Sequence, residues 1–286
     1  MQPSDVSAVV CTLNSIESIQ VCLESLREAG VGELIVVDAQ STDGTREVAN
    51  AFADQVLSDQ GLGLGQARNV GIENTRLPLI LNMGSDNIMP PGQLPKMIRD
   101  LVDNKHQGVS ARTLIEGRGF VSDGLNAWRA GRFVPGPAQV IGTPTLFDGD
   151  LLRVNPYDPS RIYSDDSELC ERWAREVGAT FCISSAFVLE TGKATWDQVV
   201  VRCRMYGISD REVFSTGDKS GWTTARKIQS LLHPLKSDLV PPLKRLPARQ
   251  AIRNAPFLAA FATMRYGFWL DSAVRGTTQA SKRSSI

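Results

Sequence analysis

Short apolar runs alternate with amphipathic segments through residues 1–115. Apolar runs at residues 7–11, 34–37 and 79–81 predict buried strands, because each is short and ends at polar or turn residues. Helices are predicted from apolar residues that recur at spacings of three and four, as in Ile16, Ile19, Leu23 and Leu26 and again in Leu94, Met97, Ile98 and Leu101. The alternation indicates an α/β fold with a mainly parallel sheet flanked by helices.

Polar residues follow the predicted strands at their carboxyl ends. Thr12 and Asn14 follow the first strand, Asp38 ends the second, and Asp86 lies in the turn after the third. Right-handed crossovers bring these ends to one edge of the sheet, where open α/β sheets bind ligands. An Asp at this edge can hold a divalent cation and, through it, the phosphates of a substrate. A lone turn Asp is also common without any ligand, so both interpretations of Asp86 remain open.

A glycine-rich loop precedes another predicted helix. Residues 61–65 read Gly-Leu-Gly-Leu-Gly, which is not the Gly-x-Gly-x-x-Gly spacing of a dinucleotide-binding turn and does not directly follow the first strong strand. We therefore expect a flexible loop rather than a dinucleotide site. Arg68 lies in the early turns of the helix, where a guanidinium can face a phosphate or a backbone carbonyl.

The middle of the chain is less regular. The segment from Arg118 to Pro144 is rich in Gly and Pro and contains Trp128 and Phe133, which predicts loops over the active face. Residues 142–147 then return to a strand-like pattern, and residues 180–190 have strand character as well.

A second acidic site lies between these two strand-like segments. Ser164 is a predicted helix cap, Asp165 and Asp166 lie in the first turn, and Gly178 ends the helix. Acidic side chains in a first turn interact favourably with the positive end of the helix dipole. The pair could therefore serve helix stability or a catalytic role, and both explanations remain open at this point.

Composition excludes several classes of function. The 286 residues include 31 Lys and Arg against 31 Asp and Glu, which provides no overall charge for binding nucleic acid. The five cysteines form no Cys-x-x-Cys pair, so reduced thiols in a cytosol are expected rather than disulfides. The two histidines are far apart and predict no zinc site. The N-terminal residues do not resemble a signal peptide, and we expect a cytoplasmic protein.

The C-terminal part differs in composition from the rest. From Arg226 onward there are eleven Lys and Arg against only two acidic residues, Asp238 and Asp271. Residues 257–270 form an apolar, aromatic-rich stretch, which is interrupted by Arg265 and is shorter than the roughly 20 residues of a spanning helix. Such a stretch suits docking on an anionic membrane surface, here the inner face of the cell membrane. Packing against the domain or a second copy explains it equally well.

These patterns divide the chain into two expected parts. We expect residues 1–215 to form the main domain, in which residues 1–115 contain the strand ends that would bind a ligand and residues 116–215 form a second half. Residues 216–286 form a helical basic extension.

Taken in order, five motifs resemble those of the GT-A glycosyltransferases of family 2. The motifs are Val9-Val10-Cys11-Thr12-Leu13-Asn14, Val36-Val37-Asp38 with Ser41-Thr42-Asp43-Gly44-Thr45, Gly63 to Gly71 containing Ala67-Arg68-Asn69, Gly84-Ser85-Asp86, and Asp165-Asp166-Ser167-Glu168-Leu169. The resemblance covers roughly residues 5–190. It implies a GT-A-like fold and transfer of a sugar from a nucleotide-sugar donor, with UDP- or GDP-sugars as the expected donors.

The resemblance also implies roles for individual residues. The residues assigned to the nucleotide-sugar are Thr12, Asn14, Asp38, Asp43, Arg68, Ser85, Arg202 and Arg204. Asp86 would bind Mg²⁺ or Mn²⁺, which neutralises the leaving diphosphate. Asp166 would be the general base, and Asp165 beside it would raise its pKa toward useful basicity. Direct displacement inverts the anomeric centre, so no covalent nucleophile is required.

Two departures from the family pattern affect these expectations. Gly84 replaces the first Asp of the metal motif, which leaves one carboxylate; Mg²⁺ often uses only one or two. The Gln-x-x-Arg-Trp motif of processive members is absent, because Gln198 is followed by Arg202 at the wrong spacing and without a Trp. A single-addition transferase is therefore favoured.

Three functions remain after this comparison. The first is a metal-assisted, inverting transferase that acts on a glycan or lipid-linked acceptor. The second is a non-catalytic nucleotide-sugar-binding or scaffold protein whose metal motif degenerated at Gly84. The third is a nucleotidyltransferase, which is ranked last because residues 12–15 are not a glycine-rich phosphate loop.

Overall fold

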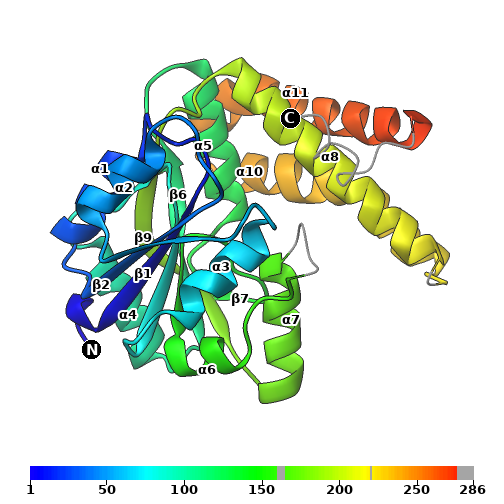
Figure 1. The fold of residues 1–286 in the computed structure, drawn as a ribbon. Helices are drawn as coiled ribbons and strands as arrows, with labels where there is room; N and C mark the ends of the chain where they lie inside the picture. Colours follow the sequence, from blue (N-terminus) through cyan, green and yellow to red (C-terminus); the bar gives the residue numbers. More distant parts are fainter. Residues whose placement is uncertain (160–164, 220, 276–286) are drawn as a thin grey trace. The chain divides into compact units, whose positions relative to one another are not determined.

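A computed structural model of the chain describes residues 1–159, 165–219 and 221–275, and the side chains of these residues except 216–219. The chain forms two compact units, each of which combines two separate stretches (Figure 1). The first unit contains Met1–Leu114 and Pro135–Gly192, and the second contains Ile115–Val134 and the chain from Lys193 onward. The sequence predicted continuous segments with a boundary at residue 215, whereas both units are discontinuous.

The first unit is built on one sheet, whose strand order among the described residues is β3-β2-β1-β4-β8-β6-β9-β5, with β7 paired to β9. The strands are β1 Val6–Thr12, β2 Glu33–Asp38, β3 Gln55–Ser58, β4 Leu79–Gly84, β5 Asn87–Ile88, β6 Gly108–Ile115, β7 Gly136–Ala138, β8 Thr145–Asp148 and β9 Phe181–Glu190. Strands β3, β2, β1 and β4 are parallel, as expected from the alternating pattern. Strand β8 is antiparallel to both β4 and β6, so the second half of the sheet is mixed.

Helices pack on both faces of this sheet. The helices of the first unit are α1 Ile19–Glu28, α2 Thr45–Phe52, α3 Leu64–Glu73, α4 Gln93–Asp103, α6 Gly149–Val154 and α7 Asp165–Val177, preceded by the 3₁₀ turn η1 Pro3–Asp5. Alternate residues of β1 enter different cores, because successive side chains of a strand point to opposite faces. Ala8 and Val10 pack with α1, α2 and α4, whereas Val9 packs with α3, α6 and α7.

The second unit is helical. Its helices are α5 Phe120–Arg132, α8 Trp196–Lys219, α9 Thr224–Leu231, the π-helix η2 Leu235–Leu239, α10 Val240–Arg245 and α11 Ala248–Arg275. Its core contains Trp128 from α5 together with Phe257 and Phe261 from α11. None of the described helices combines the length and apolar character needed to cross a bilayer.

Two local predictions met different outcomes. The expectation of loops between residues 118 and 144 was wrong for its first half, because residues 120–132 form α5 and bury Trp128. The predicted helix after residue 164 is present as α7, but its predicted cap, Ser164, lies outside the described residues.

Candidate functional site

The carboxyl ends of β1, β2 and β4 lie side by side in the first unit. In the parallel register, Thr12 is opposite Asp38, and Cys11 is opposite Gly84. Thr12 and Asp38 are both buried, and the Thr12 hydroxyl has no hydrogen-bond partner in the described part of the chain. The expectation that polar residues of separate strands gather at one edge is therefore met by the sheet register.

The loops after β1 and β2 are joined by hydrogen bonds. The side-chain oxygen of Asn14 accepts from the Thr42 amide at 2.9 Å, and the Asn14 amide donates to the Ser41 hydroxyl at 2.8 Å. Asn14 has a φ of 47°, a left-handed conformation that Asn tolerates better than most residues. Asp38 accepts from the Ser41 amide at 3.2 Å and lies 3.8 Å from Arg46. This bonding holds Asp38 at the strand edge.

Asp43 has a local structural role in this turn. Its carboxylate accepts from the amide of Thr45 at 3.0 Å and from the amide of Ile16 at 3.1 Å. The hydrogen bond from the Thr45 hydroxyl is the main cause that lowers the pKa of Asp43. These bonds orient the start of α2, and a direct donor contact of Asp43 stays a prediction.

The turn after β4 carries Ser85 and Asp86. The Ser85 hydroxyl lies 2.9 Å from the hydroxyl of Ser15, and Asp86 Oδ1 accepts from the side chain of Asn87 at 2.7 Å. The Thr191 amide donates to the Asp86 carbonyl at 2.9 Å, which ties this turn to the end of β9. Hydrogen bonds therefore restrain both the carbonyl and the carboxylate of Asp86.

A divalent cation at this turn would have one protein carboxylate. Among the described residues there is no group of three His, Cys, Asp or Glu side chains arranged to hold a metal. A Cβ built on Gly84 would lie 3.0 Å from Asp86 Oδ1, so position 84 adjoins the Asp86 carboxylate directly. Because Mg²⁺ commonly keeps several waters and uses one or two carboxylates plus substrate phosphates, the donor set fits a cation completed by the substrate.

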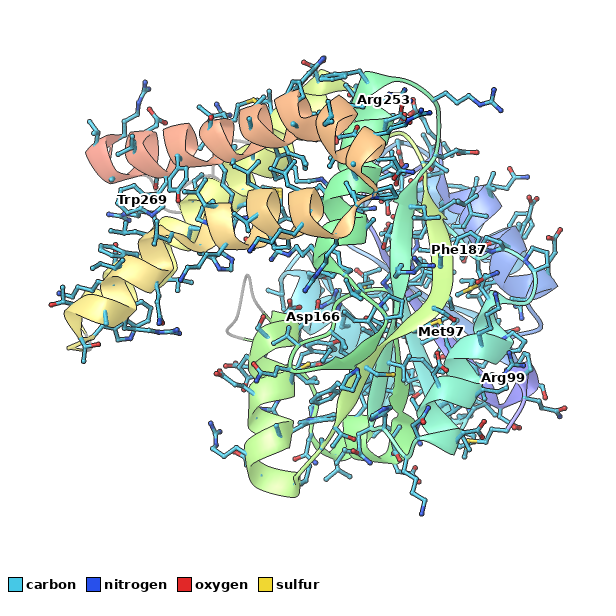
Figure 2. The ribbon with its side chains drawn as sticks, turned by 180° about the vertical axis from the view of Figure 1, so that it is seen from behind. Met97, Arg99, Asp166, Phe187, Arg253 and Trp269 are labelled. Atoms are coloured by element: carbon cyan, nitrogen blue, oxygen red, sulfur yellow. The ribbon has the colours of Figure 1, made fainter. Side chains whose placement is uncertain are left out.

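The acidic pair at the start of α7 is bound by an arginine from α3. Arg68 is 6% exposed and donates through Nη1 to Asp165 and, at 3.3 Å, to Asp166. Its other nitrogen, Nη2, donates to the Thr143 hydroxyl at 2.6 Å. A buried guanidinium with two carboxylate partners is a charge-compensated arrangement rather than a surface ion pair. Figure 2 labels Asp166 at this end of α7.

Tyr157 completes the surroundings of Asp166. Its hydroxyl donates to Asp166 Oδ1 at 3.2 Å and accepts from the side chain of Asn82 at 3.3 Å. The Arg68 guanidinium lies 4.9 Å from the centre of the tyrosine ring. Asn69 fixes the backbone of Tyr157 by two hydrogen bonds, one to the carbonyl at 2.8 Å and one from the amide at 3.0 Å. Helix α3 therefore positions both groups that donate to Asp166 Oδ1, because it carries Arg68 and holds Tyr157 through Asn69.

The pKa of Asp166 is raised above its ordinary value. Burial is the largest cause; the charge of Arg68 opposes it, and the adjacent Asp165 reinforces it. Burial alone would lower the pKa of Arg68, but Asp166, Tyr157 and Asp165 raise it, so the guanidinium stays charged. Burial also raises the pKa of Tyr157, which keeps the phenol protonated as a donor.

The acidic pair lies close to the strand edge. The pKa of the Cys11 thiol, one residue before Thr12, is raised to about 12, mainly by burial, and both Arg68 and Asp165 act on it electrostatically. The structure therefore gathers the end of β1, Arg68 and the acidic pair in one region of the first unit. Tyr157 and Thr143 belong to this region, but sequence reasoning did not identify them, because Tyr157 lies in an irregular segment and the strand-like pattern around Thr143 indicated no chemical role.

Arg202 and Arg204 are on α8 of the second unit. The guanidinium of Arg204 lies 5.1 Å from the ring centre of Phe268 on α11. Neither arginine is among the residues that the first unit brings together, and their role toward the donor stays a prediction.

Comparison with known proteins identifies the family. The profile of the family described as Glycosyl transferase family 2 matches residues 7–150. Glycosyltransferase AglJ of Haloferax volcanii is 30% identical over 102 residues, which cover 35% of this chain and 34% of AglJ. This chain thus aligns with about a third of the length of that relative.

Two solved structures share the fold at low sequence identity. The mannosyltransferase PcManGT of Pyrobaculum calidifontis, in complex with GDP-Man and Mn²⁺, has a TM-score of 0.62 at 17% identity, and the match covers 96% of this chain and 87% of that one. Residues 1–349 of S. aureus TarS, in complex with UDP, have a TM-score of 0.52 at 15% identity, and the match covers 97% and 92%. The GT-A-like α/β fold class is thereby confirmed, and the chain belongs to glycosyl transferase family 2.

Proposed function

We propose that the protein is an inverting, single-addition glycosyltransferase that moves a sugar from a nucleoside-diphospho-sugar to an acceptor hydroxyl. The observation that carries this proposal is the placement of Asp166, a carboxylate with a raised pKa that is held by Arg68 and Tyr157. A base works best when its pKa approaches the working pH, so the raised pKa suits proton abstraction.

The nucleoside is assigned to the edge formed by β1 and β2. Asp38 offers strong acceptors for ribose hydroxyls or a base N–H. The Thr12 hydroxyl beside it is buried and has no hydrogen-bond partner among the described residues, which supports a ligand at this edge because buried polar groups are normally paired. Asn14 holds the adjoining loop through Thr42. UDP- and GDP-sugars are the proposed donors, in line with the UDP of the TarS complex and the GDP-Man of the PcManGT complex.

Asp86, with Ser85 beside it, is assigned to the diphosphate end of the donor. Asp86 would hold a Mg²⁺ or Mn²⁺ ion, which would supply positive charge to the leaving diphosphate. The Mn²⁺ in the PcManGT complex supports a divalent ion at this kind of fold. The hydrogen bond from the Asn87 side chain to the Asp86 carboxylate and the bond from the Thr191 amide to the Asp86 carbonyl restrain this turn, which supports the assignment.

Asp166 acts on the acceptor. Its carboxylate takes the proton of the acceptor hydroxyl while the hydroxyl oxygen bonds to the anomeric carbon of the donor sugar. The bond between that carbon and the diphosphate oxygen breaks, and the nucleoside diphosphate leaves. Arg68 and Tyr157 keep the carboxylate oriented during this single displacement, which inverts the anomeric centre.

The proposed acceptor is a glycan, either part of a polysaccharide or linked to a lipid. A lipid-linked acceptor is presented at a membrane surface, which agrees with the basic composition of the chain from Arg226 onward. Contact of this C-terminal region with the inner face of a membrane is therefore part of the proposal.

The test separates donor binding from transfer. Asp166→Asn should bind donor and Mn²⁺ as the unchanged protein does, but should lose transfer activity by about a hundredfold or more, because the neutral amide cannot accept the acceptor proton. A thermal-shift screen of UDP- and GDP-sugars with Mn²⁺ or EDTA measures binding, and nucleoside diphosphate release measures turnover. Asp103→Asn, an exposed position on α4, is the matched control. Full transfer by Asp166→Asn would exclude Asp166 as the base.

A second function is favoured by one observation, the Gly at position 84. A protein that binds nucleotide-sugars without transferring them would need no second metal carboxylate. Such a protein would show the thermal shift with donor but no donor hydrolysis at any Mn²⁺ concentration. Slow hydrolysis of the donor that depends on Mn²⁺ would exclude this alternative.

A further inference from the structure

An apolar pocket of about 290 Å³ lies within the second unit. Its lining comes from α8, the end of α9 and the following turn, and α11, through Asp210, Ser230, Leu231, Pro234, Tyr266, Trp269 and Leu270. Figure 2 labels Trp269 on α11. The volume is close to the lower end of the roughly 300–1,000 Å³ of ligand pockets.

The chemistry of the lining favours hydrocarbon over sugar or phosphate. Asp210 is already paired with Arg265, which donates to both of its carboxylate oxygens. The Tyr266 hydroxyl donates to the carbonyl of Leu231 at 2.6 Å. The indole of Trp269 and the side chains of Leu231, Pro234 and Leu270 supply apolar surface. An alkyl or isoprenoid chain would leave these polar pairs intact.

Apolar surface continues outside the pocket. Every residue of α9 is described and none is buried, and Ile228 on this helix is 52% exposed. Leu231 and Leu232 at its end are 39% and 37% exposed, and Leu270 on the pocket wall is 57% exposed. A short helix without a fully buried residue that presents apolar side chains beside an apolar pocket is typical of an interfacial segment.

The charged residues around α9 indicate which kind of membrane surface this region would bind. Arg226, Lys227 and Lys236 belong to residues 221–240, and Arg226 lies 5.0 Å from the ring centre of Trp222. The acidic residue of this segment, Asp238, is fully buried and paired with Arg132 and Arg265. On α11, the exposed Asp271 next to the pocket forms an ion pair with Arg275. The segment therefore presents net positive charge, which is complementary to anionic lipid headgroups.

We propose that this pocket takes a hydrocarbon chain of an anionic bilayer phospholipid, with α9 lying at the level of the headgroups. Arg226 and Lys236 contact the phosphates, Trp222 and Ile228 lie in the interface, and the hydrocarbon chain packs against Trp269 and Leu270. The inference rests on the proposed membrane contact but not on sugar transfer, because the lipid is not the reacting acceptor.

The experiment uses the full chain without donor. Vesicles of phosphatidylcholine alone, and of phosphatidylcholine mixed with phosphatidylglycerol, are compared in a sedimentation assay. Acyl chains that carry bromine then report contact with tryptophan by fluorescence quenching. We expect binding to the anionic vesicles only, and we expect quenching that falls in Trp269→Phe. Arg226→Gln and Lys236→Gln should each lower partitioning about fivefold, whereas the exposed Lys105→Gln in the first unit should not.

A second pair of variants tests the pocket itself. Leu270→Gln should reduce quenching and partitioning severalfold, and Val154→Gln, which is more exposed and lies in the first unit, should leave both unchanged. Thermal unfolding checks that both variants remain folded. Equal partitioning on neutral and anionic vesicles, or anionic binding whose quenching is the same in Trp269→Phe, would overturn the proposal. So would a concentration-dependent dimer that Leu270→Gln abolishes, because a second copy would then be the occupant.

The outcomes also separate this inference from the proposed function. If the protein transfers sugar to a soluble glycan but does not bind vesicles, only the proposed lipid site is excluded. Vesicle binding and quenching without any transfer would support the lipid site and count against the transferase.

Discussion

Opposing influences act on a single carboxylate, that of Asp166. Burial and the neighbouring Asp165 disfavour its charged form, whereas Arg68 and the hydroxyl of Tyr157 favour it. The net result is a raised pKa, so the carboxylate is a stronger base than an exposed Asp but remains held by hydrogen bonds. Because the partners come from α3 and from the segment before α7, the balance depends on side chains far apart in the sequence.

Tyr157→Phe should shift the pH profile of transfer. The lost hydrogen bond normally lowers the pKa of Asp166, so this pKa should rise further in the variant. A base must be deprotonated to act, and activity falls as the pH drops through its pKa. The acid limb of kcat/KM should therefore move to higher pH, with donor binding unchanged. Tyr266→Phe in the second unit is the matched control. An unmoved acid limb would show that Tyr157 does not tune the base.

Gly84→Asp should restore a second carboxylate beside Asp86. A Cβ at position 84 would lie 3.0 Å from Asp86 Oδ1, so the two acids would repel without a cation. We expect a lower melting temperature in EDTA, recovery with Mn²⁺, and tighter Mn²⁺ binding by calorimetry than in the unchanged protein. Asp86→Ala should abolish the Mn²⁺ effect in the unchanged protein and weaken it in Gly84→Asp, which then keeps a single carboxylate. Identical Mn²⁺ affinity with and without the new carboxylate would argue against a metal at this turn.

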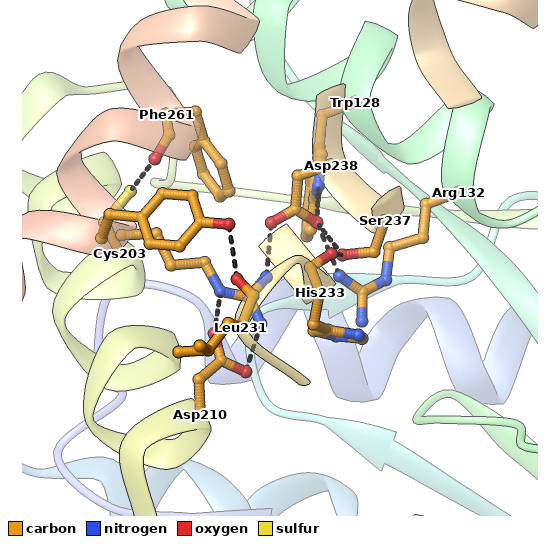
Figure 3. A network of polar contacts seen from close by, with 11 residues as sticks. Trp128, Arg132, Cys203, Asp210, Leu231, His233, Ser237, Asp238 and Phe261 are labelled. Carbon is orange, nitrogen blue, oxygen red and sulfur yellow. Dashed lines mark hydrogen bonds and ion pairs between the residues drawn. The ribbon is translucent and has the colours of Figure 1, made fainter. Parts of the chain in front are cut away.

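At the scale of elements, buried ion pairs connect the helices of the second unit (Figure 3). Asp238 on η2 accepts from the indole nitrogen of Trp128 at 2.9 Å and from Arg132 at 2.7 Å, both on α5, and it also pairs with Arg265 on α11. Arg265 in turn pairs with Asp210 on α8. One fully buried carboxylate therefore links three helical elements, and a fourth is reached through Arg265.

Asp238→Ala should unfold the second unit more readily. The change removes the acceptor of Arg132, of the Trp128 indole N–H and of Nη1 of Arg265, which keeps only Asp210, and breaking a buried ion pair costs about 3–5 kcal/mol. Asp123→Ala removes the exposed pair with Arg253 in the same unit and should cost about 0–1 kcal/mol. Chemical denaturation followed by tryptophan fluorescence measures both. Equal losses would mean that the buried network adds no special stability.

Two glycines on helices should respond oppositely to a methyl group. A Cβ on Gly124 of α5 would lie 2.2 Å from the ring of Phe257, so Gly124→Ala should destabilise the unit by about 1–3 kcal/mol through overpacking. Apart from the nearby backbone of its own helix, Gly267 of α11 has no described atom within 4 Å of that position, so Gly267→Ala should stabilise the helix by about 0.5–1 kcal/mol. Free energies of unfolding test the contrast. Stabilisation by Gly124→Ala would contradict the tight contact with Phe257.

At the scale of the whole molecule, the sequence predicted correctly those elements that depend on residues near one another in the chain. The strands β1, β2 and β4 and the helices α1 and α4 were predicted near their observed bounds, because period and turn residues determine them directly. Helix α5 was missed because its glycines were interpreted as loop signals. Gly124 and Gly131 instead permit close packing, since a Cβ on Gly131 would meet the backbone of Pro242. A glycine required by a distant neighbour looks the same in the sequence as one required by a turn.

The sequence by itself determined the α/β class, the family and the polar residues at the strand ends, because repeated strand and helix patterns and ordered motifs are properties of neighbouring residues. Tertiary structure alone decided that Arg68 binds the Asp165–Asp166 pair and that Tyr157 shares it. It also decided that residues 115–134 join the C-terminal helices in one unit. These contacts depend on how distant segments pack, and no local pattern encodes the partner of a buried charge.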